Sequence, residues 1–240
     1  MKRFNWNNIR LVLMLCTLVF LYAFATRRND ARMVKKPVVE FISKDSFITK
    51  EMVNKLLIQN FWGAAGVEKV EVDLHKVEKT IAKNPMVGQA EVYTTVDGKL
   101  VAKVTQKKPV ARVFEGTQSY YLDYEGNKMP LSEKQTARVP LVTGEVQKID
   151  GKRLGRLLDF IYDDDFLKKN ITGLSIQQNG SVIMSTRGYD YDIYFGSPYN
   201  VEAKFKNYKA FLQDAVKDTL IKNYKTVNLV FLHQVVCTKK

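Results

Sequence analysis

The chain has 240 residues, a formal net charge of +13 and only two cysteines. Cys16 and Cys237 lie near opposite ends of the sequence, so folding does not depend on a disulfide framework. The basic residues are spread along the chain rather than clustered with aromatic residues, which argues against a nucleic-acid-binding motif and favours a general attraction to anionic surfaces.

An uncharged apolar segment runs from Leu11 to Ala25 with basic residues on both sides, as in a membrane anchor or a secretion signal. Its fifteen residues would form a helix of only about 22 Å, against a hydrocarbon core of ~30 Å. The helix can extend from Trp6 to Thr26 if Arg10 reaches the interface. We therefore predict a cytoplasmic tail (residues 1–10) and a transmembrane anchor (residues 11–26). The anchor residues include Leu11, Leu15, Val19 and Ala25.

Two alternatives to this anchor stay open. Ala23-Phe24-Ala25 is a small-x-small pattern that a signal peptidase could cut, so the segment could instead be a cleaved signal. Basic residues are also more numerous after the segment than before it, which by charge alone would place the bulk of the chain inside the cell. A long following domain crosses the membrane largely regardless of charge, so we expect the bulk outside the cytoplasm.

Residues 37–115 are predicted to form a compact α+β domain. The expected elements are a strand at 38–42, helices at 52–61 and 74–81, and hairpin strands at 90–96 and 100–104. Asp73 is a good N-cap for the second helix, and Asp97-Gly98 marks the hairpin turn. Two amphipathic helices can bury their apolar faces only against one face of this sheet. Lys107-Lys108-Pro109 then interrupts the last strand, and we place the domain boundary near residue 115.

Residues 116–240 are predicted to be rich in short strands. Strands are expected at 120–123, 139–143, 174–177, 181–186 and 189–195, and helices at 151–167 and 201–221. The β-branched and aromatic run Thr226–Val236 predicts one last strand.

Several short segments resemble the FtsQ/DivIB family of bacterial division proteins. They are Ala82–Val87 before a strand, Lys108–Ala111 after the hairpin, Tyr121–Gly126, Val139–Gly144, and Phe195-Gly196 followed by Lys204. The first domain resembles a POTRA (polypeptide-transport-associated) module. The last strand departs from the family pattern, with Asn228 in place of an acid and Val230 in place of an arginine.

This resemblance implies an α+β fold made of an N-terminal transmembrane helix, a POTRA-like βααββ domain and a β-rich domain with helices and a final β-strand. It further implies a non-catalytic scaffold of the bacterial divisome, active in septum formation, without cofactors or a small-molecule substrate. The protein would span the inner membrane once, with its bulk in the periplasm, and recruit small division proteins of the FtsB and FtsL type.

In this family the terminal-strand region is the docking edge, and an open sheet edge can accept a strand from a partner. Carried over by position, Val227–Val236 would offer that edge. Phe231, His233 and Val235 would then share one face by alternation. The competing interpretation is that these three are ordinary core residues of a last strand.

No catalytic constellation is found in the sequence. His75 and His233 are the only histidines and fall in different predicted domains, and Asp163-Asp164-Asp165 lacks the spacing of a calcium loop. Two other functions remain as alternatives: a POTRA-type transport or outer-membrane assembly factor, and a cleaved secreted enzyme or binding protein.

Overall fold

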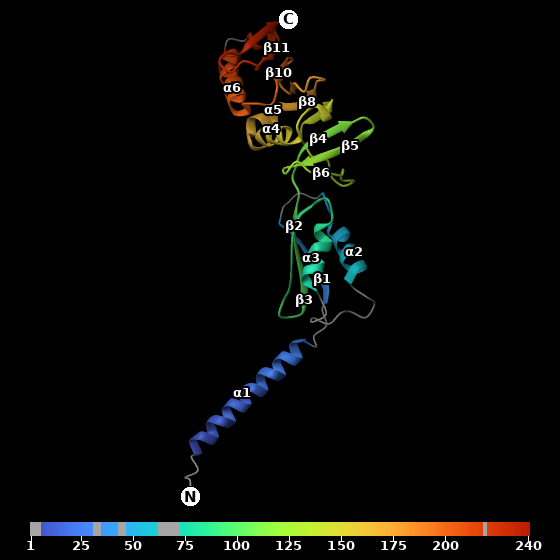
Figure 1. Cartoon of the computed structure of the whole chain (residues 1–240), viewed down its shortest axis with the longest axis vertical. Helices are drawn as coiled ribbons and strands as arrows, with labels where there is room; N and C mark the ends of the chain where they lie inside the picture. Colours follow the sequence, from blue (N-terminus) through green and yellow to red (C-terminus); the bar gives the residue numbers. More distant parts are fainter. Residues whose placement is uncertain (1–5, 31–34, 43–46, 62–72, 218–219) are drawn as a thin grey trace. The chain divides into compact units, whose positions relative to one another are not determined.

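The computed structural model describes residues 6–30, 35–42, 47–61, 73–217 and 220–240 (Figure 1). The chain divides into two compact units, Met1–Gln106 and Lys107–Lys240, and each is described by itself. The predicted α+β composition is confirmed, with an N-terminal apolar helix followed by two separate mixed units.

Helix α1 (Trp6–Asp30) extends the apolar run at both ends. Its 25 residues correspond to about 37 Å, which exceeds the ~30 Å hydrocarbon core. Leu11, Leu15 and Val19 are each at least 60% exposed, and none of its most apolar window is buried. The helix is therefore long and apolar enough to cross a membrane, a test that a signal sequence also passes. Of the predicted tail, residues 1–5 lie outside the described residues, and residues 6–10 are helical.

The first unit contains the predicted βααββ order. Its elements are β1 (Lys35–Phe41), α2 (Lys50–Phe61), α3 (Leu74–Ala82), β2 (Val87–Thr94) and β3 (Lys99–Gln106). The sheet order is β1-β3-β2, with β1 parallel and β2 antiparallel to the central β3. Asp73 caps α3 as predicted, since its Oδ1 accepts a hydrogen bond from the Lys76 N–H (3.1 Å). Val77 and Ile81 of α3 are fully buried, so this helix uses one face for the core.

The second unit is built on a nine-stranded sheet in the order β12-β11-β10-β9-β8-β7-β4-β5-β6. Its first strands are β4 (Pro109–Glu115), β5 (Gln118–Asp123), β6 (Lys128–Met129) and β7 (Leu141–Gly144). The later strands are β8 (Ile171–Ile176), β9 (Val182–Thr186), β10 (Asp192–Gly196), β11 (Tyr224–Asn228) and β12 (Val236–Lys239). The helices are α4 (Gly151–Asp163), α5 (Asp165–Asn170) and α6 (Val201–Lys217), with short 3-10 turns η1 (Val146–Lys148) and η2 (Leu220–Asn223).

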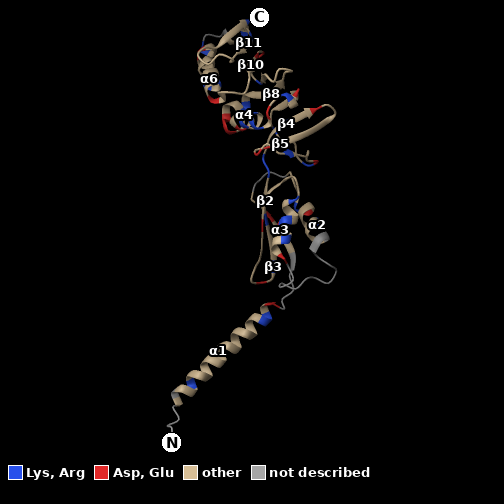
Figure 2. Ribbon diagram, viewed as in Figure 1, with Lys and Arg blue, Asp and Glu red and all other residues tan. Residues whose placement is uncertain are grey.

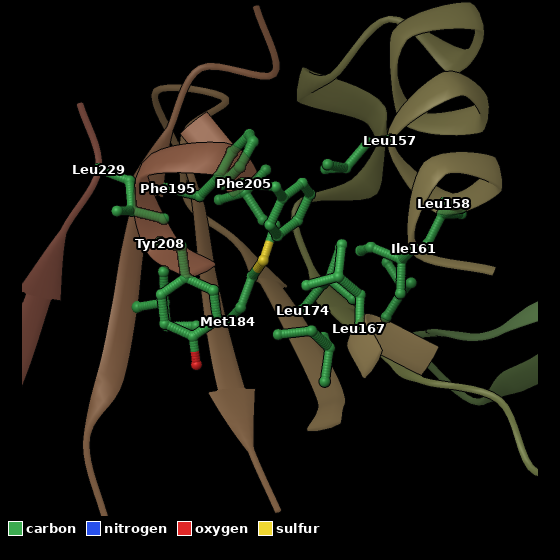
Figure 3. Packing of buried hydrophobic residues seen from close by; sticks show 14 of the residues in the cluster. Leu157, Leu158, Ile161, Leu167, Leu174, Met184, Phe195, Phe205, Tyr208 and Leu229 are labelled. Carbon is green, nitrogen blue, oxygen red and sulfur yellow. The ribbon is translucent and has the colours of Figure 1, made fainter. Parts of the chain in front are cut away.

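The core of this unit lies between the helices and the central strands (Figure 3). Helix α4 buries residues at helical spacing, namely Leu154, Leu157, Leu158 and Ile161. They pack in one cluster with Met184 of β9 and with Phe195 and Phe205, whose rings lie 5.1 Å apart. Each such side chain contributes about 1.5–3 kcal/mol when fully buried, so this cluster dominates the stability of the unit.

The division between the units falls at Gln106 and Lys107, earlier than the predicted boundary near residue 115. Strand pairing explains the difference. Strand β4 pairs antiparallel with β5 and parallel with β7, so it is part of the second sheet rather than the last strand of the first unit.

The helix predicted at 151–167 is two helices that meet at Asp164. This residue has extended backbone angles, and its Oδ1 accepts hydrogen bonds from the N–H groups of Phe166 (3.1 Å) and Leu167 (3.0 Å). A carboxylate that caps a new first turn competes with continuation of the preceding helix. Asp164 also forms an ion pair with Lys209 of α6, which fixes the bend to the neighbouring helix.

Candidate partner-binding edge

Strand β12 is one edge of the nine-stranded sheet. It pairs antiparallel with β11, with Val227 opposite Cys237 and Asn228 opposite Val236. Strand β11 in turn pairs parallel with β10, so β12 extends a sheet that is anchored in the core through the fully buried Val227. An edge supported in this way is rigid enough to act as a template for another strand.

The hydrogen-bonding groups on the open side of β12 follow from its alternation. The Lys240 N–H donates inward to the Asn223 carbonyl (2.9 Å). In an antiparallel ladder the N–H and C=O of one residue point to the same side, and the side alternates along the strand. The main-chain groups of Cys237 and Lys239 therefore point away from β11, where a further strand could pair with them.

The single last strand predicted at Thr226–Val236 is wrong, because the structure has two strands, β11 and β12, joined by a loop. Two hydrogen bonds from amide side chains account for the break. Asn228 Oδ1 accepts from the Val230 N–H (2.9 Å), and Asn207 Nδ2 on α6 donates to the Leu232 carbonyl (2.7 Å). The first bond is a local turn of the kind that asparagine favours, so Asn228 was the available sequence signal.

The three predicted site residues lie in this loop and do not share a strand face. Phe231 is 48% exposed and His233 is exposed, whereas Val235 packs partly against the core. The structure instead groups Phe231 with other exposed apolar residues of the loop and of the start of β12. This apolar loop cluster consists of Val230, Phe231, Leu232 and Val236, each at least 40% exposed. Sequence reasoning included Val236 in the edge segment but missed Lys239, because it treated the two strands as one that ends at Val236.

A buried lysine holds the main chain on which this loop packs. Lys204 on α6 is only 5% exposed, and its Nζ donates to the carbonyls of Phe195 and Ser197 at 2.7 Å each. Burial lowers the pKa of Lys204. Between those carbonyls, Gly196 has φ +71°, and a Cβ there would lie 2.8 Å from a methyl group of Val230. The Gly-spacer-Lys element of the sequence is therefore structural: it shapes the β10–α6 connection so that the apolar loop cluster can pack over it.

Other segments with family resemblance are also structural. In Tyr121–Gly126, the Asp123 side chain is 3% exposed and accepts from Lys107 Nζ (2.5 Å) and from the Asn127 N–H (2.7 Å). Burial acts to raise the pKa of Asp123, but the bonds from Lys107 and Asn127 outweigh it and lower the pKa. In Val139–Gly144, Gly144 has φ +87°, and a Cβ there would lie 2.2 Å from the Ile176 carbonyl oxygen on β8.

The described residues contain no group of three His, Cys, Asp or Glu side chains that could hold a metal ion. His75 lies on the exposed side of α3, with Nδ1 3.5 Å from Glu78. A polar cavity of about 450 Å³ borders the end of the edge, beside Tyr189, Lys225 and Lys240. Lys240 pairs there with Asp190 (2.8 Å), which fastens the residue after β12 to the β9–β10 connection.

Comparison with known proteins agrees with this architecture. A model of the family described as FtsQ/DivIB, C-terminal related, matches residues 108–238, and a model of the POTRA-like domain matches residues 36–105. No curated protein matches the chain closely enough to count as a relative.

Among solved structures, one similar chain is the major extracytoplasmic domain of the trans isomer of the bacterial cell division protein DivIB from Geobacillus stearothermophilus. It is 15% identical, with a TM-score of 0.29, and the match covers 48% of this chain and 98% of that chain. A TM-score this low does not support a fold assignment, so the assignment rests on the family matches. Because the C-terminal match covers more than half of the sequence, the chain belongs to the FtsQ/DivIB family of bacterial cell-division scaffold proteins.

Proposed function

We propose that this protein is a single-pass scaffold of the inner membrane that recruits small division proteins of the FtsB and FtsL type outside the cytoplasm. Its open edge, β12, takes up a strand from the partner, and the apolar loop cluster contacts apolar side chains beside that strand. The observation that carries the proposal is the position of β12: a short, core-supported edge strand in the terminal region that the family uses for docking.

The chemistry of the edge fits strand addition. Main-chain pairing supplies affinity that depends little on sequence, while side chains next to the new strand supply specificity. Val236 is 41% exposed at the start of β12, and Phe231 is 48% exposed in the loop before it. Phe231 and His233 stay our proposed contacts from the loop. We also propose Val235 as a contact, with a smaller exposed area because it packs partly against the core.

Two substitutions of Lys239 test the use of the edge. Proline at Lys239 removes an N–H that points away from β11, so it costs the partner a hydrogen bond without breaking the β11–β12 ladder. Lys239→Ala removes the side chain and keeps the N–H. We expect Lys239→Pro to abolish co-purification of the full chain with an FtsB-type partner and Lys239→Ala to retain it. Equal capture by both variants would contradict strand addition at β12.

A second pair of variants tests the apolar loop cluster. Phe231→Asp places a charge on a side chain that is already exposed, so the fold should survive while partner capture falls. The matched control is Val96→Asp, a 78% exposed apolar residue in the hairpin turn of the first unit. If Phe231→Asp captures the partner as well as Val96→Asp does, the cluster is not a contact surface.

The anchor is supported by the length of α1 and by the exposure of its most apolar window, and the helix is apolar on nearly all sides. Mass spectrometry of the intact protein from membranes distinguishes an anchor from a cleaved signal. We expect the full chain, and a mature start at Thr26 would contradict the anchor. Protease digestion of spheroplasts tests orientation, because digestion of residues 107–240 from outside requires the bulk to be extracytoplasmic.

A further inference from the structure

We propose that the outer face of the helical layer in the first unit docks on an anionic bilayer surface. This face consists of Met52, Lys55 and Ile58 on α2 and Lys76, Lys79 and Lys83 on and just after α3. The inference rests on the proposed membrane anchor, because the anchor is what brings this unit to the lipid.

The three lysines of the α3 segment form one stripe. At about 100° per residue, positions 76, 79 and 83 fall within roughly 60° of one another, on the side opposite the buried Val77 and Ile81. All three are exposed, and within the described part of the chain none has an ion-pair partner within 4 Å. On the ribbon of Figure 2, lysine positions of α3 are marked in blue. An unpaired stripe of this kind is suited to a surface of many phosphates rather than to one carboxylate.

The carboxylates near the stripe are occupied by other groups. Glu78 Oε1 accepts from the Val92 N–H of β2 (2.9 Å), and its Oε2 lies 3.5 Å from His75. Asp73 accepts from the main chain of Lys76 as the N-cap. Glu51 on α2 is exposed and is the one further acid on this face of the described helices. The lysines of the face therefore outnumber the carboxylates that oppose them.

Helix α2 adds exposed apolar side chains to the same layer. Met52 and Ile58 are each 47% exposed and lie on either side of Lys55, on the surface opposite the buried Val53 and Leu57. Apolar side chains between lysines are typical of faces that enter the headgroup region of a bilayer, where the lysine stems lie along the acyl boundary.

The other face of the unit does not fit an anionic surface. Across the three strands, Glu40 on β1 and Glu91 on β2 lie on either side of Lys103 on β3. By alternation Lys99 of β3 shares this face, but it pairs with Asp97 (3.8 Å), so the face carries no surplus of basic side chains to attract phosphates. The choice between the two faces of the unit is therefore decided by charge.

The short connection to α1 keeps the unit within reach of lipid. Helix α1 ends at Asp30 and β1 begins at Lys35, and five residue steps span at most about 18 Å. When α1 spans the membrane, this tether gives the helical layer a high effective concentration at the bilayer surface. Each lysine near anionic lipid then favours the docked state by roughly fivefold in the docking equilibrium. Several such weak contacts suffice to hold the helical layer at the bilayer surface.

Lysine footprinting of the full chain tests the inference. The protein is placed in nanodiscs of phosphatidylcholine alone or with about one-third phosphatidylglycerol, and acetylation rates are measured residue by residue. We expect Lys76, Lys79 and Lys83 to react at least about threefold more slowly in the anionic discs, and the difference to vanish at high salt. Lys152 and Lys206, exposed on α4 and α6, serve as internal controls with unchanged rates.

A single variant tests whether the stripe acts as a unit. Lys79→Gln should weaken docking about fivefold and restore fast acetylation of Lys76 and Lys83, whereas Lys206→Gln should leave their protection intact. Equal rates in both kinds of disc would overturn the inference and leave the anchor in place. A chain that fails to enter either disc would overturn the anchor, and this inference with it.

Discussion

Replacing Lys204 by methionine tests how the candidate edge and the loop before it are stabilised. Methionine keeps most of the aliphatic stem and removes the ammonium group, whose Nζ donates to the carbonyls of Phe195 and Ser197. Phe195 is fully buried, so its carbonyl loses its charged donor without access to water. Ser197 is exposed, and its carbonyl can turn to solvent instead.

The magnitude follows from these differences. An unsatisfied buried carbonyl costs about 1–3 kcal/mol, and loss of the cation from its place 4.6 Å over the Phe195 ring adds up to about 1 kcal/mol. The methionine also removes the desolvation penalty that lowers the pKa of Lys204, which offsets part of the loss. We expect a net destabilisation of the second unit of about 2–3 kcal/mol.

Hydrogen exchange of the full chain in detergent measures this value. Amides of Ile193 on β10 and Val227 on β11 are fully buried and should exchange only when the unit unfolds. A loss of 2–3 kcal/mol corresponds to roughly 30- to 150-fold faster exchange at these positions. The control is Lys206→Met, an exposed position on the same helix, with less than about threefold change. If the two variants behave alike, the argument that Lys204 supports the edge is refuted.

Two further predictions concern a buried acid and a strained glycine. Burial and then the neighbouring Asp163 raise the pKa of Asp159 to about 6, above its unfolded value of 3.8. Ionisation therefore costs folding stability as the pH rises through this interval. Asp159→Asn should stabilise the protein at pH 7 by about 1–2 kcal/mol, the full shift of ~3 kcal/mol being discounted for partial exposure, and should flatten thermal stability between about pH 4 and 6. A slope like that of the unsubstituted chain would contradict this. Gly144→Ala combines a positive φ with a contact to the Ile176 carbonyl, and should lower the free energy of unfolding by about 3 kcal/mol or more in urea titration. Gly155→Ala on α4 meets open space and should instead stabilise by about 0.5–1 kcal/mol, so equal effects at the two glycines would argue against the steric explanation.

Sequence patterns were sufficient to predict the elements whose structure is decided by residues close together in the chain. The N-cap at Asp73, the helix face of α4 and the antiparallel meander β8-β9-β10 all depend on interactions over a few residues or one turn, and the sequence shows them. The assignment of β4 to the second sheet could not be read in this way. Its pairing with β5 is a local hairpin around the turn at residues 116–117, but its place in the larger sheet depends on the parallel pairing with β7, which the packing of the whole unit decides.

The candidate site shows the same limit. Residues 226–236 have the composition of one long strand, which Asn228, His233 and Gln234 interrupt. The bond from Asn207 that completes the loop comes from a helical residue 25 positions before Leu232, so no local pattern contains it. From the sequence, Phe231 and His233 were expected on a strand face, whereas the structure has them in the loop between β11 and β12.

An open edge strand also bears on self-association. Two copies of this protein could pair through β12, and such edge-to-edge pairing is a common start of aggregation. Strand β12 has only four residues, and Lys239 and Lys240 give its end a positive charge in every copy. In parallel pairing the like-charged ends of two copies lie side by side and repel each other, whereas a partner strand without basic residues at that position does not suffer this repulsion. Lys239 would thus act against parallel self-association through this edge.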